Sequence, residues 1–387
     1  MVLAYPFRLF FLAGGVYAVV SMAGWLGFLA GHVGRVGPGA GMLWHGHEMV
    51  FGYTLAVVAG FILTAVSNWT GSAPWKGRPL AALGLLWLAG RLAFTFAPWL
   101  PSALVASVDL AFLPALTYML AVPLVAAGNR RQFIILGVLA ALFFADLAVH
   151  MEISGLWLGG GHLGVVVGVD LLIMLITMLG GRIIPAFTGN ALRARGITAL
   201  PVTRDWLERA ALLSLVAVVV LDTVAELSPL AGVAALAAAA LHGFRLAGWQ
   251  GHRVLRQPIL WVLHLGYGWL VLGLALKGLA VLSPALPTAA ALHALTVGAV
   301  GTLTIGIMSR VALGHTGRPL TVAPITIAAY LVITAAAVVR VVVPAALPGL
   351  TEPAMTVSGM LWIAAFILFL IGHAGILTKP RADGRPG

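Results

Sequence analysis

The sequence predicts an all-α fold, a polytopic bundle of about 12 transmembrane helices, and two observations lead to it. First, 61% of the 387 residues are apolar and only 9% are charged, whereas a soluble domain is about half apolar and a quarter charged. Second, the apolar residues form continuous blocks of about 20, the length that a helix needs to cross the bilayer. A membrane barrel would instead show segments of about ten residues with alternating polarity. The lipid bilayer is therefore the expected surroundings of this chain.

Apolar blocks bounded by proline, glycine and charged residues mark the expected spans. In the first half of the chain they cover residues 9 to 30, 45 to 67, 79 to 97, 103 to 127, 132 to 152 and 161 to 184. In the second half they cover residues 206 to 226, 229 to 247, 258 to 280, 289 to 312, 321 to 343 and 355 to 377. The connector 185 to 205 and the C-terminal tail are short and basic, so residues 1 to 387 are expected to form a single transmembrane domain.

The net charge of +11 follows the predicted topology. If both termini are cytoplasmic, all but four of the 22 Lys and Arg residues fall on the inner side, as the positive-inside rule requires. The four exceptions, at or near the outer side, are Arg35, Arg91, Lys277 and Arg340. An odd number of spans would destroy this alternation. The basic balance is therefore a topology signal and does not predict a nucleic-acid partner.

The chain has no cysteine, which excludes disulfides, iron–sulfur clusters and thiolate ligands and leaves histidine, methionine, tyrosine and carboxylates as metal ligands. Five histidines are expected in the outer leaflet. His45 and His47 open the second span, His150 ends the fifth, His162 opens the sixth and His293 opens the tenth. Ionisable groups are costly in a membrane, and several histidines at one depth on different helices suit a cofactor held between helices.

The alternative for any single histidine is a residue at a helix end that hydrogen-bonds a carbonyl or water. We expect His32, His252 and His373 to be histidines of this kind, without a metal or haem. A similar choice applies to the charged residues on the outer side, which can pair with each other, anchor haem propionates or line a proton path. They are Arg91, Asp109, Asp146, Glu152, Asp222, Glu226, Lys277 and Arg340.

The densest cluster of polar residues is WHGHEMVFGY, residues 44 to 53. Histidines two apart on a regular helix point about 200° away from each other, so His45 and His47 are not expected to share one metal. Glu48 can hold the second N–H of a ligating imidazole, donate or accept protons, or simply favour the positive helix N-terminus. Gly52 and Gly60 leave room for a flat macrocycle or, more commonly, for a neighbouring helix.

The sequence after His47 and the sequence after His293 share the same spacing of glycines. Glycines follow each histidine at the same offsets of five and thirteen residues. Both helices are expected to run from outside to inside with a histidine at the same depth, which is the geometry for coordinating one haem iron by two histidines.

Four stretches of the sequence, in the same order along nearly the whole chain, resemble the NnrS family. They are WHGHEMVFGYTLAVVAGFILTAVSNWTG (44–71), GGRIIPAFTGNAL (180–192), LRQPILWVLHLGYGWL (255–270) and HALTVGAVGTLTIGIMSRVALGHTGRPL (293–320). Members of that family are polytopic proteins of the bacterial inner membrane that contain haem and copper and belong to the response to nitric oxide, often alongside denitrification. The resemblance implies haem b and copper as cofactors, and the motif histidines that carry over are His45, His47, His264, His293 and His315.

The architecture is also similar to that of haem-copper oxidases and related nitric oxide reductases, which have twelve core spans with haem-ligating histidines on spans 2 and 10. His45 or His47, His162 and His293 occupy comparable positions. The tenth span lacks a pair of histidines two apart, and the seventh has no adjacent histidines. A copper site with three histidines is therefore not expected, and the comparison is an analogy of fold.

These observations predict a membrane haem protein that binds nitric oxide, with histidines and carboxylates that are also suited to its reduction by electrons from an external donor. We predict that His47 and His293 hold haem and that Glu48 donates protons. His45 and His162 are predicted to bind a second metal. Copper is the first choice for this metal because the family resemblance implies it. His264 lies at a similar depth to His242, where the two suit a second haem or equally two hydrogen-bonded core histidines. The alternative function is a transporter or sensor of nitric oxide or a metal–nitrosyl species, without turnover; buried charges such as Lys277 and Asp222 fit a transporter as well.

Overall fold

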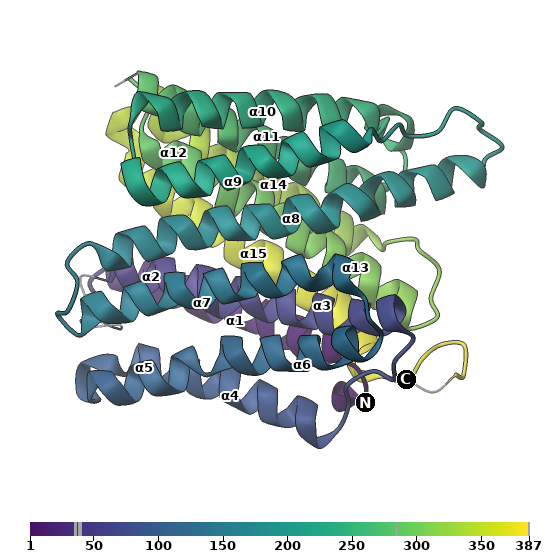
Figure 1. Cartoon of the computed structure of the whole chain (residues 1–387), viewed down its shortest axis with the longest axis horizontal. Helices are drawn as coiled ribbons and strands as arrows, with labels where there is room; N and C mark the ends of the chain where they lie inside the picture. Colours follow the sequence, from purple (N-terminus) through teal and green to yellow (C-terminus); the bar gives the residue numbers. More distant parts are fainter. Residues whose placement is uncertain (35–36, 38–40, 284, 386–387) are drawn as a thin grey trace. The chain divides into compact units, whose positions relative to one another are not determined.

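The computed structural model describes residues 1–34, 37, 41–283 and 285–385, and every regular element in these ranges is a helix (Figure 1). Arg35 lies outside the described residues. The α-helices are α1 Pro6–Leu29, α2 Met42–His47, α3 Leu55–Thr70, α4 Arg78–Thr95, α5 Ser102–Leu110, α6 Phe112–Ala126, α7 Phe133–Ile153, α8 Gly160–Arg193, α9 Asp205–Ala225, α10 Pro229–Gly248, α11 Pro258–Leu282, α12 Thr288–His293, α13 Thr302–His315, α14 Pro324–Ala346 and α15 Thr351–Thr378. The shorter segments are η1 Val2–Ala4, η2 Glu48–Thr54, η3 Ala97–Trp99, η4 Arg130–Gln132, η5 Gly251–Val254, η6 Ala294–Gly301 and η7 Pro348–Leu350.

Each of the twelve predicted ranges coincides with a helix or a run of helices, which confirms the all-α, multi-pass membrane fold. Ten of the helical runs in the described residues are long and apolar enough to cross a membrane. The other two predicted spans are α4 and α9, whose windows are more polar because they carry charged residues. The count of twelve spans and the cytoplasmic position of both termini stay predictions.

The ends of the helices follow local rules. Pro6, Pro229, Pro258 and Pro324 each stand at the first position of a helix, where the missing N–H costs nothing and the fixed φ already suits the helix. Gly71 ends α3 in the left-handed conformation at φ 70°, which a residue without Cβ adopts freely. Proline at the first position of a helix and glycine after its last residue thus mark where these helices begin and end.

Two of the predicted spans are interrupted in the same way. In the second span, α2 ends at His47 and is followed by the π-helical segment η2 and then by α3. In the tenth span, α12 ends at His293 and is followed by the π-helical segment η6 and then by α13. π-Helical turns are rare and often occur at functional sites. The two spans therefore share a backbone conformation as well as the spacing of glycines after the histidine.

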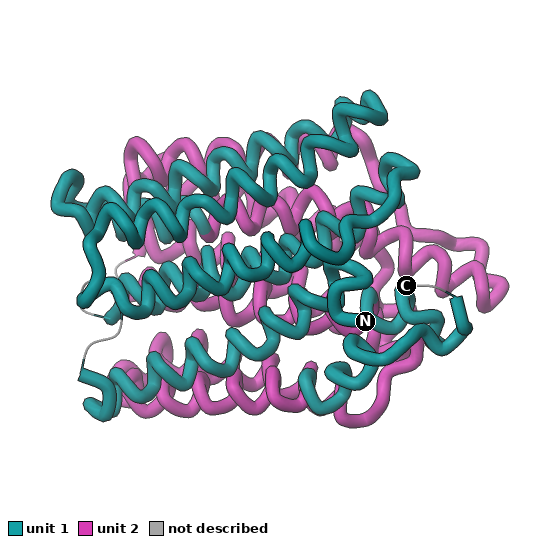
Figure 2. Tube along the Cα trace, turned by 90° about the horizontal axis from the view of Figure 1, so that it is seen from below, with its two compact units in different colours: residues 1–168, 311–319, 369–387 teal, residues 169–310, 320–368 magenta. Residues whose placement is uncertain are grey.

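The chain folds into two compact units that alternate along the sequence (Figure 2). Unit 1 comprises residues 1–168, 311–319 and 369–387, and unit 2 comprises residues 169–310 and 320–368. The helices α8, α13 and α15 each contribute residues to both units. Within unit 2, α10 packs between α9 and α11. The single transmembrane domain stays a prediction.

Both ends of the chain meet within unit 1, near the labels N and C in Figure 1. The guanidinium of Arg8, on α1, is fully buried and donates to the carbonyls of Leu377 at 2.9 Å and Lys379 at 2.8 Å. The tail beyond α15 is fixed as well. Arg381 donates to the carbonyl of His315 at 2.8 Å and pairs with Asp383, which lowers the pKa of that carboxyl to about 2. The first helix is thus tied to the last.

Candidate metal centre

His47 occupies the centre of a buried group of polar side chains in unit 1. It is the last residue of α2, and its side chain is fully buried. Its Nε2 lies 2.9 Å from Oδ2 of Asp109, on α5, and 2.9 Å from Oδ1 of Asp146, on α7. One N–H can point at only one of these two oxygens, so the nitrogen and the two carboxylates converge more closely than a simple hydrogen bond requires.

His150 joins the same group from α7. It stands four residues after Asp146, and residues at that spacing share one face of a helix. Its Nε2 lies 2.9 Å from Oδ2 of Asp109 and 3.9 Å from Oδ1 of Asp146. The ligand atoms of His47, Asp109, Asp146 and His150 all lie within 4.8 Å of one another, and all four residues are buried. We call these four residues the His–Asp cluster.

A second layer of polar side chains surrounds the His–Asp cluster. Glu48, the first residue of η2, has Oε1 3.3 Å from Nδ1 of His47 and Oε2 2.7 Å from NH1 of Arg91. The hydroxyl of Tyr17, on α1, donates to Oε2 of Glu48. Arg91, on α4, also pairs with Asp109. Each residue of this layer therefore holds a member of the cluster or a neighbour of it.

The charges of these side chains do not cancel. Three carboxylates, those of Glu48, Asp109 and Asp146, face the single guanidinium of Arg91, and all four side chains are at most 3% exposed. Neutral imidazoles would leave two negative charges in a dry site, where uncompensated charge is costly. Protons on the histidines or on a carboxylate balance this charge, and so does a divalent cation.

The donor set fits a divalent transition-metal ion. Two imidazole nitrogens and two carboxylate oxygens are the ligands of tetrahedral zinc sites and are also suited to copper and iron. If Nε2 of His47 binds the ion, its Nδ1–H points at Glu48, which is the usual carboxylate–histidine–metal arrangement and fixes the ring. Contacts of 2.9 Å are shorter than the spacing between ligands of one ion, so binding requires a small opening of the cluster.

The surroundings of His47 fit a haem less well. Both of its ring nitrogens face carboxylates, and its ring stacks on Phe94 with centroids 3.6 Å apart and an interplanar angle of 13°. An axial haem ligand needs one ring nitrogen to face the iron and space for the macrocycle beside it. These contacts offer neither at His47.

The structure shows why glycine follows His47 at two positions. A Cβ at Gly52 would lie 2.5 Å from Oε2 of Glu48 and 2.9 Å from NH1 of Arg91, so the ion pair needs a glycine there. A Cβ at Gly60 would lie 2.9 Å from the ring of Phe11, on α1, which is close helix packing. The corresponding Gly298 and Gly306 approach side chains of α11. Helix packing therefore accounts for three of the four echoed glycines.

The other histidines predicted as ligands lie outside the His–Asp cluster. His45 is half-buried and stacks on Trp25 with ring centroids 4.7 Å apart. His162, near the start of α8, is exposed, and His315, at the end of α13, packs on Phe7 at 5.6 Å. Both belong to unit 1. The shared metal site of His45 and His162 stays a prediction.

Two predicted ligands belong to unit 2. His264, on α11, is buried with Nε2 2.9 Å from the hydroxyl of Thr188. His293, at the end of α12, is half-buried and its Nδ1 lies 2.7 Å from the carbonyl of Ala289. Since His47 belongs to unit 1, the coordination of one haem by His47 and His293 stays a prediction as well.

The sequence assigns Asp109, Asp146 and His150 to the outer side but does not identify them as a ligand set; the structure brings the three together. The signal was available in one respect, because Asp146 and His150 are spaced by four residues on one helix. Asp109 carried no such local signal, since its role depends on which side of α5 faces α7.

Unit 2 has two buried ion networks of its own. Nζ of Lys277, on α11, lies 2.8 Å from Asp170, on α8, and also contacts Asp222, on α9. Nearer the other end, Arg245 of α10 pairs with Glu208 of α9 and donates to the hydroxyl of Tyr267 at 2.7 Å. These contacts agree with the expectation that charged residues of the spans pair with each other.

The family described as "NnrS protein" matches residues 1–381 of the chain. A search of curated proteins finds no match.

Proposed function

Because the chain belongs to the NnrS family, we propose that it is a metal-containing membrane protein of the bacterial response to nitric oxide, with the metal ion bound in the His–Asp cluster. The observation that supports this most is the convergence of two imidazoles and two carboxylates, all buried, with ligand atoms within 4.8 Å of one another. A divalent ion balances the negative charge of these carboxylates and provides a binding place for nitric oxide. Copper is the first choice, because the family resemblance implies it and imidazole suits it.

The residues around the cluster support a reductase-like activity. Coupling two nitric oxide molecules to nitrous oxide and water consumes two electrons and two protons. A donor protein would supply the electrons. Tyr17 donates a hydrogen bond to Glu48, and Glu48 lies 3.3 Å from His47. This pair can hold a proton beside the metal ligands, which is the role proposed for Glu48.

Haem b is a separate part of the proposal. Of the two roles that the sequence gives His47, the contacts support metal ligand over haem ligand. His293 keeps its predicted role as a haem ligand, and a difference spectrum of the purified protein tests for the cofactor.

A transporter or sensor is the second candidate function. The triad of Lys277, Asp170 and Asp222 favours it, because paired charges inside spans often mark ion or proton pathways. The two functions differ in turnover. A reductase consumes nitric oxide continuously with an artificial electron donor and yields nitrous oxide, whereas a sensor binds it stoichiometrically.

Metal analysis of purified protein tests the proposed site. We expect about one non-haem transition-metal ion per chain in the unmodified protein and a large loss of it in His150→Ala and Asp146→Asn, since each variant removes one ligand of the ion. The matched control is His252→Ala, which removes an exposed histidine. Unchanged metal content in both cluster variants would reject the site.

A further inference from the structure

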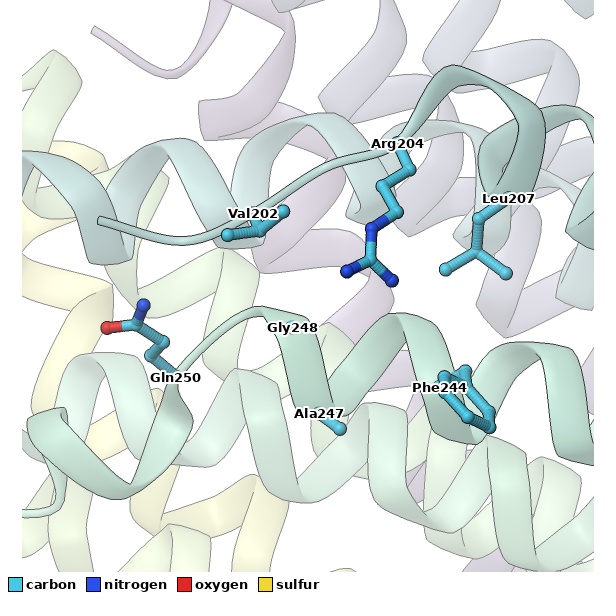
Figure 3. Close-up of a pocket in the computed structure, with 7 residues that line it drawn as sticks. All are labelled: Val202, Arg204, Leu207, Phe244, Ala247, Gly248 and Gln250. Atoms are coloured by element: carbon cyan, nitrogen blue, oxygen red, sulfur yellow. The ribbon is translucent and has the colours of Figure 1, made fainter. Parts of the chain in front are cut away.

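A pocket of about 280 Å³ opens in unit 2, beside the ion pair of Arg245 and Glu208. It lies between the connector that precedes α9 and the last turns of α10 (Figure 3). The residues lining it are Val202, Arg204, Leu207, Phe244, Ala247, Gly248 and Gln250. The predicted topology puts this end of the helices at the cytoplasmic surface of the membrane.

The walls of the pocket are held by backbone and side-chain contacts. The N–H of Val202 donates to the carbonyl of Gly248 at 3.0 Å, and a Cβ at Gly248 would lie 2.8 Å from the carbonyl oxygen of Val202, so this approach requires glycine. Gln250 adopts the left-handed conformation at φ 56° and its Nε2 donates to the carbonyl of Leu200 at 2.7 Å. The connector is thereby fixed over the end of α10, and the pocket is preformed.

The pocket carries a positive charge that the protein does not neutralise. Figure 3 shows the guanidinium of Arg204 pointing from the connector towards α10. Within the described part of the chain Arg204 forms no ion pair, and the nearby carboxylate of Glu208 is held by Arg245. Basic residues outnumber acidic ones in the adjoining segments, where Asp205 and Glu208 stand against Arg193, Arg195, Arg209, Arg253 and Arg256.

The rim of the pocket is apolar and exposed. Phe244 is 70% exposed and Val202 is 52% exposed, and Trp206, next to the pocket residue Leu207, is 59% exposed. Aromatic side chains at this position are typical of the interface between the head groups and the hydrocarbon of a bilayer. A ligand of the pocket therefore meets a cation on one side and apolar surface on the other.

We propose that this pocket binds the phosphodiester head group of an anionic phospholipid of the cytoplasmic leaflet, with Arg204 bound to the phosphate and the acyl chains running over Phe244. Basic pockets between spans on the cytoplasmic side are a recurring form of lipid recognition. Guanidinium is well suited to the phosphate because its planar N–H groups match the oxygens.

The test measures lipid binding by the full-length protein in detergent. Phosphatidylglycerol is titrated against the unmodified chain, Arg204→Gln and Ala247→Trp, and bound lipid is counted by native mass spectrometry. We expect phosphatidylglycerol to bind the unmodified chain with at least about tenfold higher affinity than Arg204→Gln, the size of one lost charge-assisted hydrogen bond. Ala247→Trp fills the pocket without removing a charge and should lose binding to a similar extent.

Three controls decide the outcome. Arg131→Gln removes an exposed arginine of unit 1 and should bind phosphatidylglycerol like the unmodified chain; an equal loss in this variant would mean non-specific attraction and overturn the proposal. Equal retention of phosphatidylcholine and phosphatidylglycerol would overturn it too. If inorganic phosphate competes at the same concentration as the lipid, the site takes a free anion and the lipid proposal fails.

Discussion

At the scale of single residues, Arg91 joins two carboxylates from different parts of the chain. Its guanidinium, in a side chain 3% exposed, pairs with Glu48 and Asp109. Removing one partner of a buried ion pair is far more harmful than the pair is helpful, because the remaining charges stay buried and uncompensated. We therefore expect the loss of Arg91 to lower the stability of unit 1.

We predict that Arg91→Ala destabilises the protein by about 3–5 kcal/mol, seen as a lower apparent melting temperature in detergent. The matched control is Arg130→Ala, an exposed arginine whose loss should have little effect. Adding Glu48→Gln to Arg91→Ala should recover part of the loss, since one of the stranded carboxylates is then neutral. A double variant less stable than Arg91→Ala would contradict this electrostatic explanation.

His293 gives a prediction about the haem. If it is an axial ligand, His293→Ala should lower the haem content of the purified protein or change its reduced-minus-oxidised spectrum, because an iron–nitrogen bond cannot be replaced inside hydrocarbon. His252→Ala, at an exposed position, should leave the spectrum unchanged.

The same spectra, together with metal analysis, test the role of His47. We expect His47→Ala to lower the content of the non-haem metal and to leave the haem bands in place, as its contacts with Asp109 and Asp146 suggest. Loss of the haem bands in His47→Ala would instead support coordination of one haem by His47 and His293. Loss of haem in His264→Ala, with none in His293→Ala, would move the cofactor to His264.

At the scale of elements, the π-helical segment η2 brings Glu48 and Gly52 onto the side of Arg91. We predict that Gly52→Ala displaces the Glu48–Arg91 pair, because its Cβ would lie 2.5 Å from Oε2 of Glu48. Metal content and melting temperature should both fall. Gly137→Ala is the matched control, since a Cβ there meets no atom within 4 Å and alanine favours a helix. Equal behaviour of the two variants would show that η2 tolerates a side chain.

The positions of the elements could be predicted from the sequence, but their rotations could not. Blocks of apolar residues bounded by proline and glycine located the spans, and depth followed from topology. An amphipathic helix reveals its buried face through an apolar stripe, whereas α7 and α11 are apolar apart from a few residues and show no such stripe. No pattern in the sequence therefore indicated that Asp146 turns towards Asp109. The 200° between His45 and His47 was informative, because it correctly separated the two side chains.

At the scale of the whole molecule, the predicted topology can be checked in the natural background because the chain has no cysteine. Single cysteines are placed at Gly349, in η7, and at Ala73, after α3, both exposed. A membrane-impermeant thiol reagent added to intact spheroplasts should label Gly349→Cys and leave Ala73→Cys unlabelled until the membrane is opened. The reverse pattern would invert the orientation and place both termini outside.

The contact of Arg8 with the end of α15 has a consequence for how the protein is made. Arg8 is synthesised before its acceptors on Ile376 and Leu377, which follow 368 and 369 residues later. At bacterial rates of roughly 5–20 residues per second, the acceptor residues are synthesised roughly 20–70 s after Arg8. During synthesis the guanidinium therefore needs water or lipid head groups as partners, and the contact between the first and last helices forms only after α15 has been made.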